Sequence, residues 1–159
     1  MYAFEPIGVI HSPFAEPAGA PIQSAVAGDV SGEVVVFDQF AEGLADLEEF
    51  DRIWLLYAFH RGGPARLRVT PFHDVVQRGL FSTRAPCRPN AIGISPVRLH
   101  AIRGTTLEVS GLDVVDGTPL LDIKPYAPQF DSFPGSRAGW LDSGATDRNN
   151  ADNRFAEPE

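Results

Sequence analysis

Residues 92–109 read IGISPVRLHAIRGTTLEV and carry the strongest fold signal in the 159-residue chain. Apolar side chains alternate loosely with polar ones from Ile92 to Ile102, as expected for a strand with one buried face. Arg103-Gly104 is typical of a tight turn, and Thr105 to Val109 supplies a second strand that we expect to pair with the first. Pro96 lacks a backbone N–H and therefore predicts a bulge or a strand edge. Together these features predict an antiparallel hairpin in a β-rich fold.

The sequence on both sides of this hairpin is punctuated by turns, because 15 glycines and 14 prolines leave little room for long helices. The run DRIWLLYAF at 51–59 predicts a central strand that is buried on both faces. Other short apolar segments predict strands at 4–11, 32–37, 67–72, 79–82 and 119–123. Seven or eight short strands separated by turns predict an all-β fold, namely a small closed or nearly closed β-barrel.

One short helix is expected within this barrel, at residues 38–47. Asp38 is a suitable capping residue there, and Phe40, Leu44 and Leu47 recur at helical spacing.

The chain is expected to form one domain over residues 1–137, followed by a polar tail at 138–159 that is rich in Asn, Asp and Gly. We expect this tail either to be disordered or to dock, on the body or on a second subunit, through Trp140, Leu141 and Phe155.

Several classes of protein are excluded by composition. The single cysteine, Cys87, excludes an intrachain disulfide and a cysteine-based zinc site, and it favours a reducing compartment. The four histidines lie far apart in the sequence, so no metal site is expected. The N-terminus lacks the pattern of a signal peptide, and no apolar run approaches the roughly 20 residues that cross a bilayer. We therefore expect a cytoplasmic protein without a membrane segment.

Charge is unevenly distributed along the chain. The formal net charge is −8, which argues against a general nucleic-acid binder. The segment from Arg52 to Arg103, however, holds nine arginines against a single acidic residue, Asp74. Such a segment either builds a cationic face for an anionic substrate or distributes its arginines over several sides of the barrel.

The first candidate site segment is FSTRAPCRPNAIGISPVRL at 81–99. Pro86 and Pro89 restrict the backbone on either side of Arg88, so its guanidinium and the amide of Asn90 are presented with little conformational freedom. Arg84 offers a planar fork that matches a carboxylate or phosphate. The alternative is a proline-rich connection with solvated arginines. His60 is a further candidate, because it ends the 51–59 strand and begins a glycine-rich loop.

The second candidate segment is VSGLDVVDGTPLLDIKPY at 109–126, which contains three aspartates. Asp116 precedes Gly117 and is the one best explained by a turn. Asp113 and Asp122 lie among apolar neighbours, where an unpaired carboxylate is costly, so each is expected to have a ligand or a donor such as Lys124.

These two segments resemble the signatures of the TsaA-like, or YaeB-like, family of S-adenosylmethionine-dependent methyltransferases. STRAPCRPNAIGISPVRL is similar to its signature of a Thr-Arg pair, an Arg-Pro-Asn and an Ile-Gly turn, and LDVVDGTPLLDIKPY is similar to its second signature. The opening IGVIHSP at 7–13, Pro21-Ile22-Gln23 and the strand ending in Phe59-His60 also match in order. The resemblance covers about residues 4 to 135.

The resemblance implies a homodimeric β-barrel methyltransferase that binds S-adenosylmethionine near the subunit interface. It also implies that the acceptor is N6 of threonylcarbamoyladenosine, next to the tRNA anticodon. Longer members continue into a second, basic domain, whereas this sequence reaches Glu159 in an acidic tail. Two alternatives therefore stay open, which are a methyltransferase of small molecules and a non-catalytic module that binds the donor.

Carried over by position, the resemblance implies nine cofactor contacts, namely Gln23, His60, Arg61, Arg84, Ile94, Ser110, Gly111, Leu112 and Asp113. Arg84 suits the carboxylate of the donor, Asp113 suits its ribose or amino group, and Ile94 and Leu112 can enclose its adenine. Arg61 replaces the glutamine expected there and adds a charge.

The acceptor side is expected to use other residues. Asp116 and Asp122 are the candidate bases, although turn capping and an ion pair with Lys124 explain them equally well. Substrate binding is expected from Arg88, Asn90, Lys124 and Tyr126. The candidates for base stacking are Phe14, Tyr126, Phe130 and Phe133.

Overall fold

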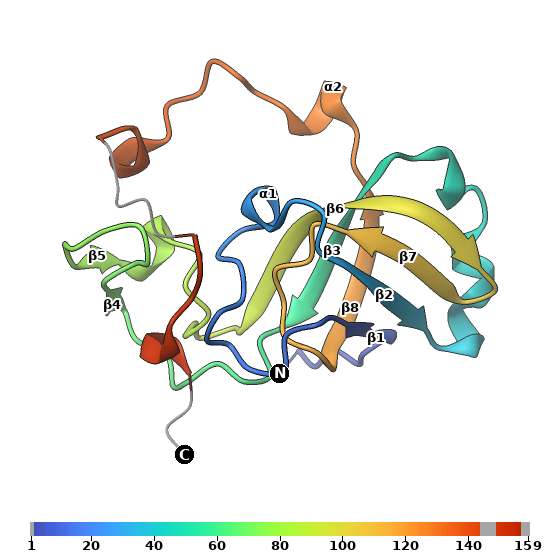
Figure 1. Ribbon diagram of the computed structural model, residues 1–159, viewed down its shortest axis with the longest axis horizontal. Coiled ribbons are helices and arrows are strands. Elements are labelled where there is room, and N and C mark those ends of the chain that lie inside the picture. The colour runs from blue at the N-terminus through green and yellow to red at the C-terminus, as the bar shows by residue number, and fades with distance from the viewer. Residues whose placement is uncertain (1, 144–148, 157–159) are drawn as a thin grey trace.

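A computed structural model describes residues 2–143 and 149–156, and its main body is a closed antiparallel β-barrel (Figure 1). The strands follow one another around the barrel in the order β1-β2-β7-β6-β3-β8. The barrel strands are β1 (Gly8–His11), β2 (Ser31–Val36), β3 (Arg52–Ala58), β6 (Ile92–Arg103), β7 (Thr106–Ser110) and β8 (Thr118–Pro125). The predicted all-β barrel is confirmed, with six barrel strands instead of seven or eight.

The predicted hairpin is formed by β6 and β7, which pair from Arg98 to Arg103 on the β6 side. Gly104 has a φ of 63° in the turn, a conformation that glycine adopts without strain. The first half of β6 pairs with β3, from Ile92 to Arg98. Pro96 lies in this half, beyond the reach of β7, so the predicted strand edge is confirmed, while the bulge lies between Leu99 and Ala101.

β3 is central, because it pairs with β6 on one side and β8 on the other. Ile53, Leu55 and Tyr57 point into the barrel and are buried, whereas Trp54 and Leu56 alternate with them and are half-buried. The prediction of burial on both faces is therefore wrong. A barrel strand has an outer face, and here Trp54 packs against Tyr126 on that face, with ring centroids 5.5 Å apart.

The predicted helix at 38–47 is replaced by two 3₁₀ helices, η1 (Asp38–Leu44) and η2 (Leu47–Glu49). Asp38 is the first helical residue and Phe37 occupies the cap position, so the capping prediction is also wrong. The run is interrupted because Asp46 adopts a left-handed φ of 64°. Leu44 and Leu47 are nevertheless buried against the barrel core. The α-helices are single turns, α1 (Ser24–Ala27) and α2 (Pro128–Asp131).

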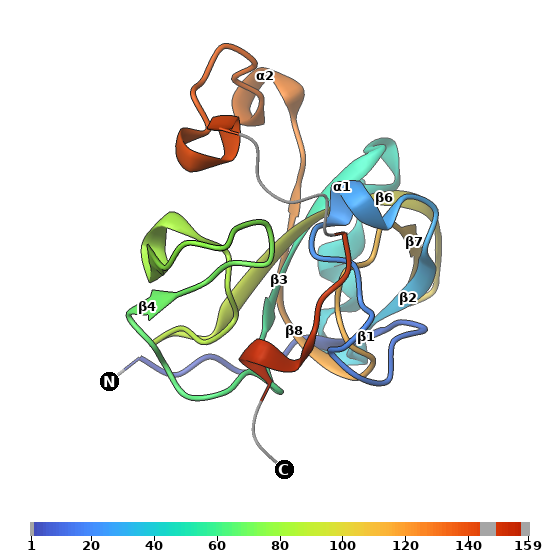
Figure 2. The ribbon, with the colours of Figure 1, turned by 60° about the vertical axis from the view of Figure 1, so that its left-hand side comes forward.

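Residues 66–88 form a side lobe next to the barrel (Figures 1 and 2). The predicted strands at 67–72 and 79–82 shorten to β4 (Arg68–Val69) and β5 (Arg78–Gly79), which form a separate two-stranded sheet. Leu80–Ser82 is a 3₁₀ helix, η3, instead of a strand. The lobe has its own small core, which comprises Val69, Leu80, Ala85, Cys87 and Phe155.

The C-terminal segment packs on both the lobe and the loops beside the barrel. It contains η4 (Gly139–Ser143) and η5 (Asn153–Phe155). Asn150 forms a bridge with Pro21, and Ala156 forms one with Gly62. Phe155 is 4% exposed and contacts Phe72 edge to face, with ring centroids 5.0 Å apart. In the part of the chain that the structure describes, no helix is long and apolar enough to cross a membrane.

Close strand packing predicts that Gly32→Ala destabilises the barrel. A Cβ at Gly32 would overlap the backbone carbonyl oxygen of His11 on β1 and the side chain of Leu112. Such overpacking is expected to lower the free energy of unfolding by about 1–3 kcal/mol, measured by urea denaturation. Gly43→Ala is the matched control, because no atom lies within 4 Å of its Cβ position. Equal stability of the two variants would contradict this packing.

Candidate functional site

A cavity of about 710 Å³ lies between the barrel and the side lobe. Its walls come from the loop before α1, the end of β3, the lobe, the start of β6, the loop after β7 and the C-terminal segment. The volume is in the range of small-molecule and cofactor sites. Residues that are distant in sequence therefore line one cavity that is large enough for a small molecule or cofactor.

A chain of three polar side chains connects two residues of the cavity wall, Tyr57 and Asp113, through the buried Ser95. Ser95 Oγ donates a hydrogen bond of 2.5 Å to Asp113 Oδ1, and Tyr57 Oη lies 3.0 Å from Ser95 Oγ. Because the serine proton points to the carboxylate, the phenol donates to the serine oxygen. Burial raises the pKa of Asp113 to about 6, against the lowering effect of the Ser95 hydrogen bond. Burial and the nearby Asp113 also raise the pKa of Tyr57, which stays a neutral phenol.

Tyr57 and Ser95 were missed by the sequence analysis. Each is a polar residue at an inward position of an apolar strand, which is the one signal that could have identified them.

Arg84 supplies a positive charge to the same cavity. Its NH1 group donates a hydrogen bond of 2.8 Å to Gln23 Oε1, and both residues line the cavity. Gln23 is neutral, so the bond orients the guanidinium without neutralising it. The positive charge of Arg84 also acts to lower the pKa of Asp113. The cavity thus holds an oriented cation and a partly buried carboxyl group.

Arg61 also lines the cavity, but its charge is balanced. Its guanidinium forms an ion pair of 2.8 Å with Glu16 and donates another hydrogen bond, also 2.8 Å, to the Ala15 carbonyl oxygen. The extra charge expected at this position is therefore compensated within the chain. Burial, followed by the Arg61 charge, lowers the pKa of the neighbouring His60.

The nine predicted cofactor residues divide into two groups. Six of them line the cavity, namely Gln23, His60, Arg61, Arg84, Ile94 and Asp113. Ser110, Gly111 and Leu112 lie behind its wall. Ser110 Oγ is 2.7 Å from His100 Nε2, Gly111 donates its backbone N–H to Val30, and Leu112 is fully buried in the barrel core. These three residues hold the loop that presents Asp113.

The two predicted bases lie elsewhere. Asp116 Oδ1 is 3.2 Å from His11 Nδ1 and accepts the backbone N–H of Ser12, which lowers the pKa of Asp116. Asp122 forms an ion pair of 2.7 Å with Lys124 and borders a second cavity, at the η1–η2 end of the barrel. The Asp122 ion pair is the structural alternative that the sequence left open, whereas the main contacts of Asp116 are with His11 and Ser12 at the end of β1.

Of the four predicted substrate residues, Arg88 lines the cavity. Its NH1 group donates to the carbonyl oxygens of Thr83 and Ala85, at 3.0 and 3.3 Å. Asn90 is exposed in the loop before β6, and Lys124 and Tyr126 lie at the end of the barrel wall where β8 pairs with Trp54.

Cys87 is fully buried in the lobe core. Among residues 2–143 and 149–156, no group of three or more His, Cys, Asp or Glu side chains is placed to hold a metal ion.

Comparison with known proteins places this chain in a family. The model of the tRNA-methyltransferase O N-terminal domain matches residues 9–132. A protein of Pyrococcus abyssi named a probable S-adenosyl-L-methionine-binding protein is 52% identical over 142 residues, which cover 89% of this chain and 77% of that protein. A Mus musculus protein named tRNA (adenine(37)-N6)-methyltransferase is 37% identical over 135 residues, which cover 80% of this chain and 31% of that protein.

Solved structures agree with this assignment. The crystal structure of TrmO from Pseudomonas aeruginosa aligns with a TM-score of 0.78 at 38% identity. The alignment covers 91% of this chain and 64% of the bacterial one. The chain therefore spans less than two thirds of that TrmO chain and about a third of the mouse protein.

The polar chain at the inner wall predicts a measurable shift in Asp113. Ser95→Ala removes a hydrogen bond that favours the ionised carboxylate, so the pKa of Asp113 should rise above about 6. Carbon-detected NMR titration of the Asp113 carboxyl group would measure it. Ser31→Ala is the matched control, since the Ser31 hydroxyl is exposed and donates to the Asp29 carbonyl oxygen. A lower pKa in the Ser95 variant would contradict this geometry.

Proposed function

The chain belongs to the family of the tRNA-methyltransferase O N-terminal domain, and on that premise we propose that it is an S-adenosylmethionine-dependent methyltransferase. We propose N6 of threonylcarbamoyladenosine, next to the tRNA anticodon, as its acceptor. The names of the Pyrococcus abyssi and mouse relatives support the donor and the acceptor, respectively. The resemblance of the two sequence segments to the TsaA-like family points to the same reaction.

The observation that carries the proposal is the presence of Arg84 and Asp113 on the walls of one cavity of about 710 Å³. S-adenosylmethionine has a carboxylate, an amino group, a ribose diol and an adenine ring. Arg84 uses one of its five N–H groups for Gln23, which leaves the fork able to bind the carboxylate. Asp113, ionised above pH 6, accepts hydrogen bonds from the ribose or the amino group. Phe59 adds apolar wall for the adenine, while Ile94 lies at the exposed edge of the same cavity.

When bound, S-adenosylmethionine supplies the electrophilic methyl group. The acceptor nitrogen belongs to a urea-like group and is a weak nucleophile, so alignment of the two reactants matters most. Asp116 and Asp122 are engaged by His11 and Lys124 away from the cavity. We therefore propose that Arg84 and Asp113, which line the cavity, contribute by positioning the donor.

We further propose that the protein acts as a cytoplasmic homodimer, with residues 1–137 as the methyltransferase domain and 138–159 as an attached tail. The segment from α2 to η4 stands away from the barrel (Figures 1 and 2). It carries Phe130 and Phe133, which are 74% and 72% exposed. Such exposed apolar groups are suited to contact with a second copy.

Arg84→Ala should weaken binding of S-adenosylmethionine by about 10-fold or more, because a charge-assisted hydrogen bond contributes about 1.5–3 kcal/mol. Isothermal titration calorimetry would measure the dissociation constant. Arg103→Ala is the control, because Arg103 is an exposed arginine paired with Glu108 in the β6–β7 hairpin. Unchanged affinity in the Arg84 variant would refute the assigned carboxylate site.

The acceptor is tested by incubating the protein and labelled S-adenosylmethionine with tRNA that carries or lacks the threonylcarbamoyl group. We expect methyl transfer to the modified tRNA alone, detected by mass spectrometry of its nucleosides. Donor binding without transfer to either tRNA would refute the proposed acceptor and favour a small-molecule acceptor or a non-catalytic module. Failure to bind the donor would refute the methyltransferase proposal itself.

A further inference from the structure

Large apolar side chains line the mouth of the cavity and are also exposed to solvent. Phe81 is 76% exposed, Leu141 49%, Ile94 44% and Ile92 39%. They come from three separate elements, η3, β6 and η4. We name these four residues and Trp140 the apolar rim. Exposed apolar groups gathered around a cavity are typical of a binding surface.

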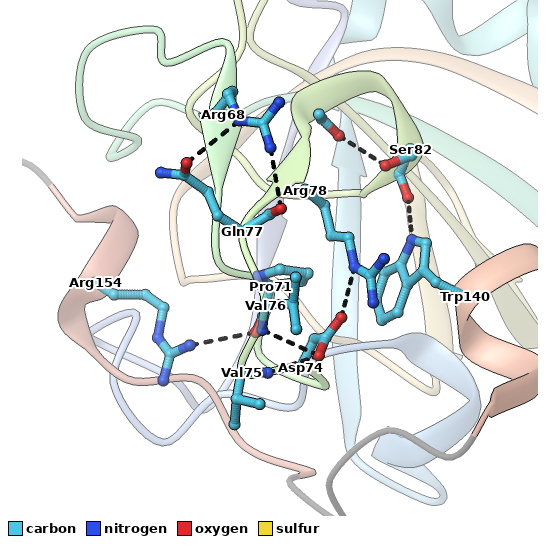
Figure 3. Close-up of polar contacts among 11 residues, drawn as sticks. Arg68, Pro71, Asp74, Val75, Val76, Gln77, Arg78, Ser82, Trp140 and Arg154 are labelled. Atoms are coloured by element: carbon cyan, nitrogen blue, oxygen red, sulfur yellow. Dashed lines mark hydrogen bonds and ion pairs between the residues drawn. The ribbon is translucent and has the colours of Figure 1, made fainter.

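Trp140 is held rigidly in this rim. Its Nε1–H donates a hydrogen bond of 2.8 Å to the carbonyl oxygen of Ser82, the neighbour of Phe81 in sequence. The Arg78 guanidinium lies 5.5 Å from the indole centroid and forms an ion pair of 2.7 Å with Asp74 (Figure 3). The indole is therefore fixed beside η3 before any ligand arrives.

Phe81 presents one face to a cation and leaves most of its ring in solvent. The Arg88 guanidinium lies 5.7 Å from the ring centroid. Arg88 is fixed by the Thr83 and Ala85 carbonyl oxygens, which are neutral acceptors, and Arg84 is fixed by Gln23 in the same way. Both arginines line the cavity and keep their charge. The aromatic surface is thus bordered by oriented cations, although the whole chain carries −8.

We propose that the apolar rim is the subsite for the acceptor nucleoside, with Phe81 and Trp140 stacking on the base of a single-stranded RNA loop and Arg88 contacting an adjacent phosphate. This inference rests on the proposed tRNA function. Proteins that read single-stranded RNA stack splayed bases on aromatic rings and arginine planes. The charged inner wall and the apolar rim then receive the two reactants in one cavity, the donor inside and the base at the mouth.

Phe81→Leu tests the stacking, because leucine keeps an apolar side chain but has no π-face. We expect the KM for threonylcarbamoyl-modified tRNA to rise about 10-fold or more, in line with the loss of one base–aromatic stack. Calorimetry should show S-adenosylmethionine affinity within about twofold of wild type. Phe81→Trp should restore the KM, since it keeps an aromatic face. Phe4→Leu is the matched control, because this phenylalanine is 71% exposed and does not line the cavity.

Four outcomes are decisive. A raised KM in Phe81→Leu, with normal donor affinity and a normal Phe4→Leu variant, supports the subsite. If wild type methylates the tRNA and Phe81→Leu does so with an unchanged KM, the subsite is refuted while the proposed function stands. If Phe81→Leu instead changes the oligomeric state measured by light scattering, the rim is an interface between copies of the chain and the subsite is refuted. Inactive wild-type protein would refute the proposed function first.

Discussion

The difference in length between two neighbouring strands, β6 and β7, determines where the cavity forms beside this barrel. β6 has 12 residues and β7 has five, so β7 pairs only with the second half of β6. The first half of β6 pairs with β3 on one side, and on the side that β7 leaves open its contacts come from loops. Ser24 Oγ donates to the Pro96 carbonyl oxygen, and Ser95 Oγ donates to Asp113. The loops before α1 and after β7 are thereby drawn to this edge, and the cavity forms against it. Gly93 contributes by its lack of a side chain, since a Cβ there would overlap the ring of Tyr57.

The electrostatics of the cavity follow from the partners that the arginines find. Arg61, Arg78 and Arg154 are neutralised by Glu16, Asp74 and Asp152. Arg84 and Arg88, in contrast, are oriented by an amide oxygen and by backbone carbonyl oxygens. Neutral acceptors restrict a guanidinium without cancelling its charge, which reduces the entropy lost on binding an anion. A chain with a net charge of −8 can in this way present a local cationic surface.

The parts that the sequence predicted well are those set by local patterns. The β6–β7 hairpin follows from alternation around Arg103-Gly104, and the barrel class follows from many short strands between turns. The helix at 38–47 was wrong because the left-handed conformation of Asp46 divides the segment into two 3₁₀ helices. The strand count was too high because β4 and β5 leave the barrel for the side lobe. The alternation of apolar and polar residues predicts strands, but it does not indicate which strands pair in the same sheet.

Among the side chains of the cavity, too, some could be identified from local sequence and others depend on the fold. Arg84 and Asp113 could be identified from sequence. Arg84 lies in a proline-rich segment of restricted conformation, and an unpaired carboxylate among apolar neighbours, such as Asp113, is costly. Tyr57 and Ser95 carry a weaker signal, namely a polar group at an inward strand position, and their contact with each other also depends on the register of β3 against β6. Phe81 and Trp140 are 59 positions apart in sequence and are joined through the Ser82 carbonyl oxygen. An aromatic residue in sequence is most simply read as core, and only its 76% exposure at the mouth of a cavity distinguishes Phe81. The charged groups of the proposed donor site are therefore visible from sequence, whereas the proposed acceptor surface becomes visible only once the fold has left it uncovered.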